Sequence, residues 1–118
     1  MTPPPPDVAV VIADYAAGRT PDRAAEKAAV KAALGALVQV APGRSVEVRI
    51  PPHAAVQVVE GSTHRRGTPA AVVETDARTW LELVTGVRPW ADAVATGDVR
   101  ASGARSDLSA YLPLFLPA

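Results

Sequence analysis

Apolar residues recur at helical spacing in the first third of the chain. Four of them fall on one face of a predicted helix over residues 7–17: Val8, Val11, Ile12 and Tyr15. Gly18 follows, and glycine commonly ends a helix because it adopts a left-handed backbone conformation without strain. Thr20 and Pro21 then suit the N-cap and first position of a second helix. We predict that this longer helix ends at the Pro42-Gly43 pair, with a buried face formed by Val30, Leu34, Leu37 and Ala41.

Alternation of apolar and polar residues replaces the helical spacing after the second helix. Val46, Val48 and Ile50 point to one side, as expected of a half-buried strand. Residues 54–60 form a second predicted strand, which has apolar residues on both faces and is therefore expected to be more central than the first. A third strand is predicted over residues 70–74. The three strands are close enough in sequence to form an antiparallel meander.

Two more helices are predicted in the second half of the chain. The first is capped by Thr75 or Asp76 and ends at Gly86. Its apolar face consists of Trp80, Leu83 and Val84. The other, shorter helix opens at Pro89 and carries Trp90, Ala93 and Val94 on one side. Large aromatic side chains on such faces usually fill a core.

The chain ends with a short strand, a helix and an apolar tail. The strand is predicted over residues 99–101, and Ser106 or Asp107 is predicted to cap the helix. The apolar face of this helix consists of Leu108, Tyr111 and Leu112, and Pro113 ends it. We expect the apolar residues that follow to pack back onto the domain. Closing a pocket, packing on a partner subunit and touching a membrane surface are the alternatives.

These elements predict an α+β fold, because helices and strands are segregated rather than alternating. The predicted architecture is a mostly antiparallel twisted sheet of about four to five strands, covered by helices. The prolines in residues 1–6 favour an extended, flexible arm. Residues 7–118 are expected to form a single domain.

Composition narrows the class of protein further. A chain of 118 residues can bury a core without disulfides or metals. The absence of cysteine excludes thiolate chemistry and suits a reducing compartment, so a cytoplasmic location is expected. The amino terminus lacks the features of a secretory signal, and no apolar run is long enough for a transmembrane segment. Because 12 basic and 12 acidic residues cancel and are mixed along the chain, nucleic acid is not an expected partner.

Few residue patterns indicate catalysis. The two histidines, His53 and His64, lie in separate predicted loops and lack the spacing of a zinc site. No serine occupies the glycine elbow of a hydrolase nucleophile. We therefore predict no catalytic residue, no metal and no cofactor.

One dense basic cluster, His64-Arg65-Arg66, falls in a predicted loop. Arginine can bind a carboxylate or phosphate through two parallel hydrogen bonds. A solvated hairpin tip is the simpler interpretation, because exposed charges are common in loops. His64, Arg66 and Glu74 nevertheless form a candidate polar rim for a pocket, and in the least favoured interpretation they are the catalytic groups of an enzyme.

The segment from Trp80 to Pro113 resembles the carboxyl-terminal half of sterol-carrier-protein domains. It has an apolar helix that ends at Gly86, a short alanine-containing helix that ends at Gly97, a strand, and then Gly103 before a leucine-rich close. Together with residues 41–49 and 66–76, the chain from about Thr20 onward is similar to the stand-alone sterol-carrier-like proteins of high-GC actinobacteria. The Ala, Arg, Val and Pro bias agrees with such a genome.

The resemblance implies a twisted sheet whose helices enclose an apolar tunnel for lipids, fatty acyl groups or sterols, with no cofactor. Carried over to this sequence, the residues that approach the tunnel are Trp80, Leu83, Val84, Trp90, Val94, Leu108, Tyr111 and Leu112. The expected function is lipid binding or lipid transfer without catalysis. The alternative is a non-binding protein-interaction or dimerisation domain, with a filled core and an apolar surface patch that pairs with a second copy or another protein.

Overall fold

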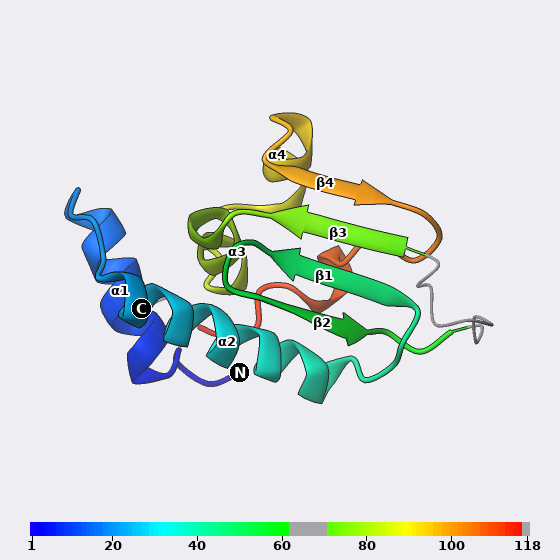
Figure 1. Cartoon of the computed structure of the whole chain (residues 1–118), viewed down its shortest axis with the longest axis horizontal. Coiled ribbons are helices and arrows are strands. Elements are labelled where there is room, and N and C mark those ends of the chain that lie inside the picture. Colours follow the sequence, from blue (N-terminus) through cyan, green and yellow to red (C-terminus); the bar gives the residue numbers. More distant parts are fainter. Residues whose placement is uncertain (62–70, 117–118) are drawn as a thin grey trace.

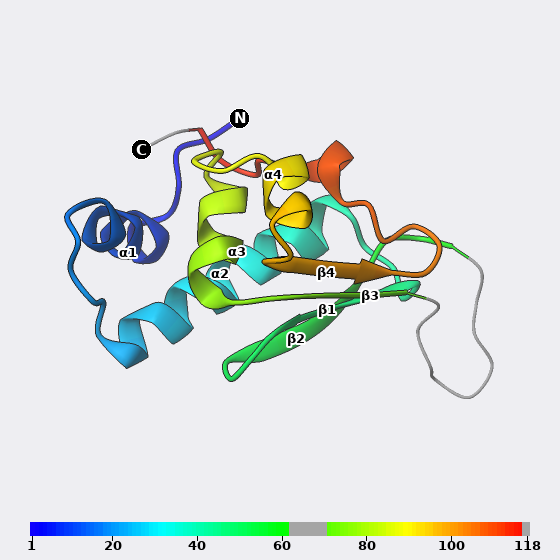
Figure 2. The ribbon, with the colours of Figure 1, turned by 90° about the horizontal axis from the view of Figure 1, so that it is seen from above.

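Four α-helices and four strands make up the part of the chain that the computed structural model describes, residues 1–61 and 71–116. In chain order they are α1 (Pro6–Ala16), α2 (Arg23–Val40), β1 (Val46–Ile50), β2 (Ala54–Val58), β3 (Ala71–Thr75), α3 (Ala77–Val84), α4 (Trp90–Ala95) and β4 (Val99–Ser102). The strands form one twisted sheet (Figure 1). Seen nearly edge-on in Figure 2, the sheet has α3, α4 and the carboxyl-terminal segment, residues 108–116, on one side. The predicted α+β fold is confirmed.

The first two helices follow the predicted pattern, with one correction. The apolar residues Val8 and Val11 of α1 are fully buried, and Gly18 ends the helix region with a left-handed φ of 73°. The predicted cap of α2 is wrong, because Asp22 rather than Thr20 is the N-cap. The Asp22 carboxylate accepts a hydrogen bond from the amide of Ala25 at 3.4 Å. The helix therefore begins at Arg23.

The sheet has the strand order β2-β1-β3-β4, which differs from a meander. β1 pairs antiparallel with β2 and parallel with β3, and β3 pairs antiparallel with β4. The sheet is therefore mostly antiparallel, as predicted, but mixed. The prediction that 54–60 is more central than the first strand is wrong: β2 lies at an edge, and β1 lies between β2 and β3.

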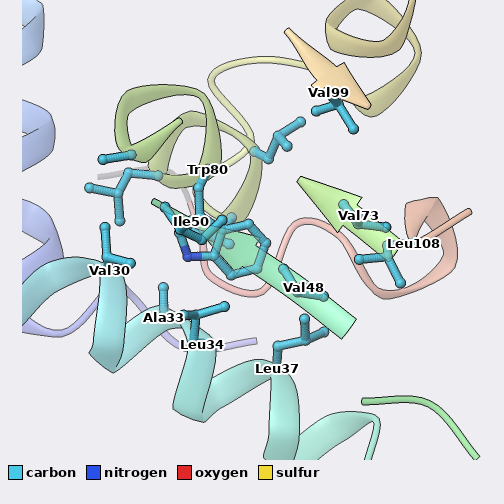
Figure 3. Close-up of a cluster of buried hydrophobic side chains, with 14 of the residues drawn as sticks. Val30, Ala33, Leu34, Leu37, Val48, Ile50, Val73, Trp80, Val99 and Leu108 are labelled. Carbon is cyan, nitrogen blue, oxygen red and sulfur yellow. The ribbon is translucent and has the colours of Figure 1, made fainter. Parts of the chain in front are cut away.

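The core lies between the sheet and the helices. Trp80 of α3 is only 1% exposed and sits among Val30, Leu34, Val48 and Ile50 (Figure 3). Its indole Nε1 is the one buried side-chain nitrogen or oxygen in the described residues that has no hydrogen-bond partner. The side chain therefore serves as apolar filling, and its N–H group is buried at a free-energy cost.

The carboxyl-terminal segment packs back on the domain, as predicted. The amides of Leu114 and Phe115 donate to the carbonyl of Val84 at 2.9 and 3.1 Å, and the amide of Leu116 donates to the carbonyl of Thr2 at 2.8 Å. No helix in the described segments is long and apolar enough to span a membrane.

The last predicted helix is wrong, because only a 3₁₀ turn forms over Ser109–Tyr111. The Asp107 carboxylate accepts the amide of Ser109, two residues on, at 2.9 Å. This tight local bond competes with a regular helix start. Pro113 then removes an amide donor close to the turn, so a longer helix cannot form.

Candidate functional site

A pocket of about 500 Å³ lies where the end of α3, the start of α4 and the carboxyl-terminal segment meet. Figure 2 shows these segments together on one side of the sheet. The lining of the pocket is mostly apolar and consists of Leu83, Gly86, Arg88, Pro89, Trp90, Ala91, Ser109, Leu112 and Pro113. The volume lies within the range of small-molecule sites.

Two turn residues create this junction. Gly86 follows α3 with a φ of +76°, a conformation that residues with a side chain rarely adopt. A Cβ placed there would lie 3.5 Å from the Pro113 ring, which is ordinary van der Waals contact, so the backbone conformation and not the space favours glycine. Pro89 then caps α4, and its extended backbone presents Trp90 at the start of that helix.

Three of the eight predicted tunnel residues meet in the pocket: Leu83, Trp90 and Leu112. Trp80, Val84 and Leu108 are instead fully buried in the core. Tyr111 is half-buried and packs against the core without lining the pocket. Val94 is 42% exposed and lines a separate hollow beside β4.

Of the candidate polar rim, only Glu74 belongs to the described residues, and it does not line this pocket. His64, Arg65 and Arg66 lie outside the residues that the structure describes. Glu74 points to the outer face of the sheet, in register with Arg49 and Arg100, and forms an ion pair with Arg100. Glu74 lines other, separate hollows.

Sequence reasoning missed Arg88, the one charged residue in the pocket lining. Its Nη2 atom donates to Asp98 Oδ2 and to Thr96 Oγ1, each at 2.6 Å. The hydrogen bond to Asp98 raises the pKa of Arg88, and the same bond lowers the pKa of Asp98. Nothing in the spacing of these residues marks the pair, because it forms only when β4 returns beside α4.

A second polar cluster was also missed, and it joins α1 to the rest of the domain. Tyr15 donates to Glu26 Oε2 at 2.6 Å, and His53 Nε2 lies 3.0 Å from Glu26 Oε1. The guanidinium of Arg78 lies 5.2 Å from the centre of the Tyr15 ring, within range of a cation–π contact. Burial, followed by the hydrogen bond to Glu26, raises the pKa of Tyr15.

The described residues contain no group of three or more His, Cys, Asp or Glu side chains that could hold a metal ion.

The hydrogen bonds of the cluster of Tyr15, Glu26 and His53 have a defined direction. A carboxylate only accepts hydrogen bonds, so His53 donates through Nε2 and Glu26 accepts from two neighbours. These hydrogen bonds therefore connect α1, α2 and the turn between β1 and β2, and their role is structural.

A family model described as bacterial SCP ortholog matches residues 22–114. The matched segment contains the whole sheet, the helices α2, α3 and α4, and every residue that lines the pocket. It leaves out α1. A comparison with curated proteins finds no match.

Proposed function

The chain belongs to the bacterial SCP ortholog family, which is sterol-carrier-protein-like, and from this premise we propose that it binds and carries an apolar small molecule or lipid. The role is that of a binding module in the cytoplasm that performs no catalysis and uses no cofactor. The binding site is the pocket between α3, α4 and the carboxyl-terminal segment.

The observation that carries this proposal is the apolar pocket itself. Leu83, Trp90 and Leu112 come from three different segments and line one volume of about 500 Å³. Each methylene of a ligand buried there contributes roughly 0.8 kcal/mol to binding. Trp90 and Leu112 are half-buried in the free protein, so a ligand would remove more of their apolar surface from water.

Native mass spectrometry of the purified protein tests the proposal. Added dodecanol, a fatty acid or a sterol is expected to give a one-to-one adduct. Leu112→Asp places a charge in the pocket lining and is expected to abolish the adduct, because a buried unpaired charge is strongly unfavourable. Val10→Asp is the matched control, since Val10 is 56% exposed on α1 and does not line the pocket. Equal loss in both variants, or no adduct with any ligand, would contradict the proposal.

One observation favours the second candidate, a non-binding interaction domain. Trp80, Val84 and Leu108, which the resemblance places at a tunnel, are at most 1% exposed and belong to the core. Exposed aliphatic side chains, Val87 and Leu116 among them, would then form the surface that contacts a second copy or another protein. Sedimentation analysis over a range of concentrations separates the candidates: a stable dimer that Val87→Asp disrupts, without ligand uptake, would favour the interaction domain.

A further inference from the structure

The charged groups in and beside the pocket determine whether a charged or an uncharged ligand binds more tightly. Its lining contains one charged side chain, Arg88, and one hydroxyl group, that of Ser109. A free arginine in an apolar pocket would attract a carboxylate, because its guanidinium forms paired hydrogen bonds with that group. Whether Arg88 is free therefore decides whether the site favours an acidic ligand.

The Nη2 group of Arg88 is already bound within the protein. Asp98 and Thr96 accept its Nη2 hydrogen bonds, and Thr79 lies 3.5 Å from Nη1. Asp98 and Thr96 do not line the pocket, so the guanidinium is bound to groups outside it. The positive charge of Arg88 is thus offset by a carboxylate of the protein itself.

The other polar group of the lining stands beside a negative charge. Asp107 Oδ1 accepts from the amide of Ser109 at 2.9 Å. This backbone bond, with the nearby Ser109 hydroxyl as a smaller cause, lowers the pKa of Asp107, so its carboxylate stays ionised at neutral pH. No basic side chain in the described residues forms a salt bridge with Asp107. An anionic head group at this rim would be repelled.

We propose that the pocket selects an uncharged ligand, such as a long-chain alcohol, over the corresponding carboxylate, and that Asp98 sets this preference by occupying Arg88. The inference rests on the proposed function. A hydroxyl head group can both donate and accept, so it can hydrogen-bond beside Ser109 without bringing a charge. A carboxylate would lose hydration and gain no free cation in return.

Isothermal titration calorimetry at neutral pH tests this inference, with dodecanol below its solubility limit and laurate below micelle formation. We expect the wild type to bind dodecanol at least about tenfold more tightly than laurate, a difference of roughly 1.4 kcal/mol. Asp98→Asn keeps the shape of the side chain and removes its charge. It is expected to raise laurate affinity about fivefold while dodecanol affinity changes less than about twofold.

Asp14→Asn is the matched control, because Asp14 also forms an exposed ion pair with an arginine, Arg19, but on α1. It is expected to leave both affinities unchanged. Asp107→Asn is a second test and is expected to raise laurate affinity without altering that of dodecanol. Laurate binding as tight as dodecanol in the wild type, or an unchanged preference in Asp98→Asn, would overturn the inference while leaving the binding function intact. Failure of both ligands to bind would overturn the proposed function, and this inference with it.

Discussion

At the scale of single residues, Tyr15 links the part of the chain inside the family match to the helix outside it. Its hydroxyl donates to Glu26 of α2, and its ring lies under Arg78 of α3. The sequence pattern placed Tyr15 on the buried face of the first helix, and this prediction is confirmed. The pattern could not reveal the bond to Glu26 or the approach of His53, because periodicity reports which face is buried and not which side chains meet across elements.

The raised pKa of Tyr15 predicts a dependence of stability on pH. The folded state favours the neutral phenol, so its contribution to the free energy of unfolding is fully present below the ordinary tyrosine pKa of about 10. It is lost as the pH rises above that value. Tyr15→Phe is expected to lower the free energy of unfolding in urea by about 1–2 kcal/mol at neutral pH. The difference in the free energy of unfolding between variant and wild type should shrink above a pH of about 10. A difference that stays constant would contradict the raised pKa of Tyr15.

The same residue gives a spectroscopic test. The chain has 2 tyrosines, so Tyr111→Phe leaves Tyr15 as the sole tyrosine. In this variant the ultraviolet absorbance of tyrosinate is expected to remain absent while the pH passes the ordinary tyrosine pKa, and to develop only as the protein unfolds. The denatured protein provides the control. Ionisation of the folded variant at the ordinary pKa would contradict the burial of Tyr15 and its hydrogen bond to Glu26.

Two glycines should respond oppositely to alanine. Gly86 has a left-handed φ, so Gly86→Ala is expected to destabilise the protein by about 1 kcal/mol through backbone strain. Gly35 lies within α2 with open space around it, so Gly35→Ala is expected to stabilise the helix by roughly 0.5–1 kcal/mol. Urea unfolding of both variants is the measurement. Equal effects would show that the turn after α3 does not require glycine.

At the scale of elements, the helices were easier to predict than the sheet. The buried face of α2 was predicted correctly at Val30, Leu34 and Leu37, because one face of a helix is set by local spacing. The position of β2 was predicted wrongly. Apolar residues on both faces suggested a central strand, but Ala54 and Ala55 are small enough to tolerate the partial exposure of an edge. Strand order depends on how the chain crosses between strands, which residue patterns do not report.

The two acidic caps predict a graded effect on helix stability. Asp76 accepts from the amide of Thr79 at 2.8 Å and from its hydroxyl at 2.9 Å, whereas Asp22 accepts from Ala25 at 3.4 Å. Asp76→Ala is therefore expected to lower the free energy of unfolding by about 1–2 kcal/mol, and Asp22→Ala by roughly half a kcal/mol. Thermal or urea unfolding measures both. A larger loss for Asp22→Ala would contradict the cap geometry.

At the scale of the whole molecule, the candidate site was predicted only in outline. The resemblance implied a tunnel approached by Trp80 and Leu108, and these side chains are buried in the core. The hollow lies nearer the surface, and it exists because the tail returns to hydrogen-bond the carbonyl of Val84. Such a return is a tertiary contact between distant segments. The sequence indicated that the carboxyl-terminal segment packs on the domain, but it did not indicate which residues the segment contacts.

The two tryptophans offer the most direct test of apolar binding at this pocket. Trp90 lines it, whereas Trp80 is buried in the core, so the two indole N–H signals in a proton–nitrogen NMR spectrum report on the two places separately. Titration with dodecanol is expected to shift the Trp90 indole signal until it saturates, and to leave the Trp80 signal nearly unchanged. Assignment uses Trp90→Phe. An unchanged Trp90 signal at saturating dodecanol, or a shift confined to Trp80, would contradict binding at the pocket between α3, α4 and the tail.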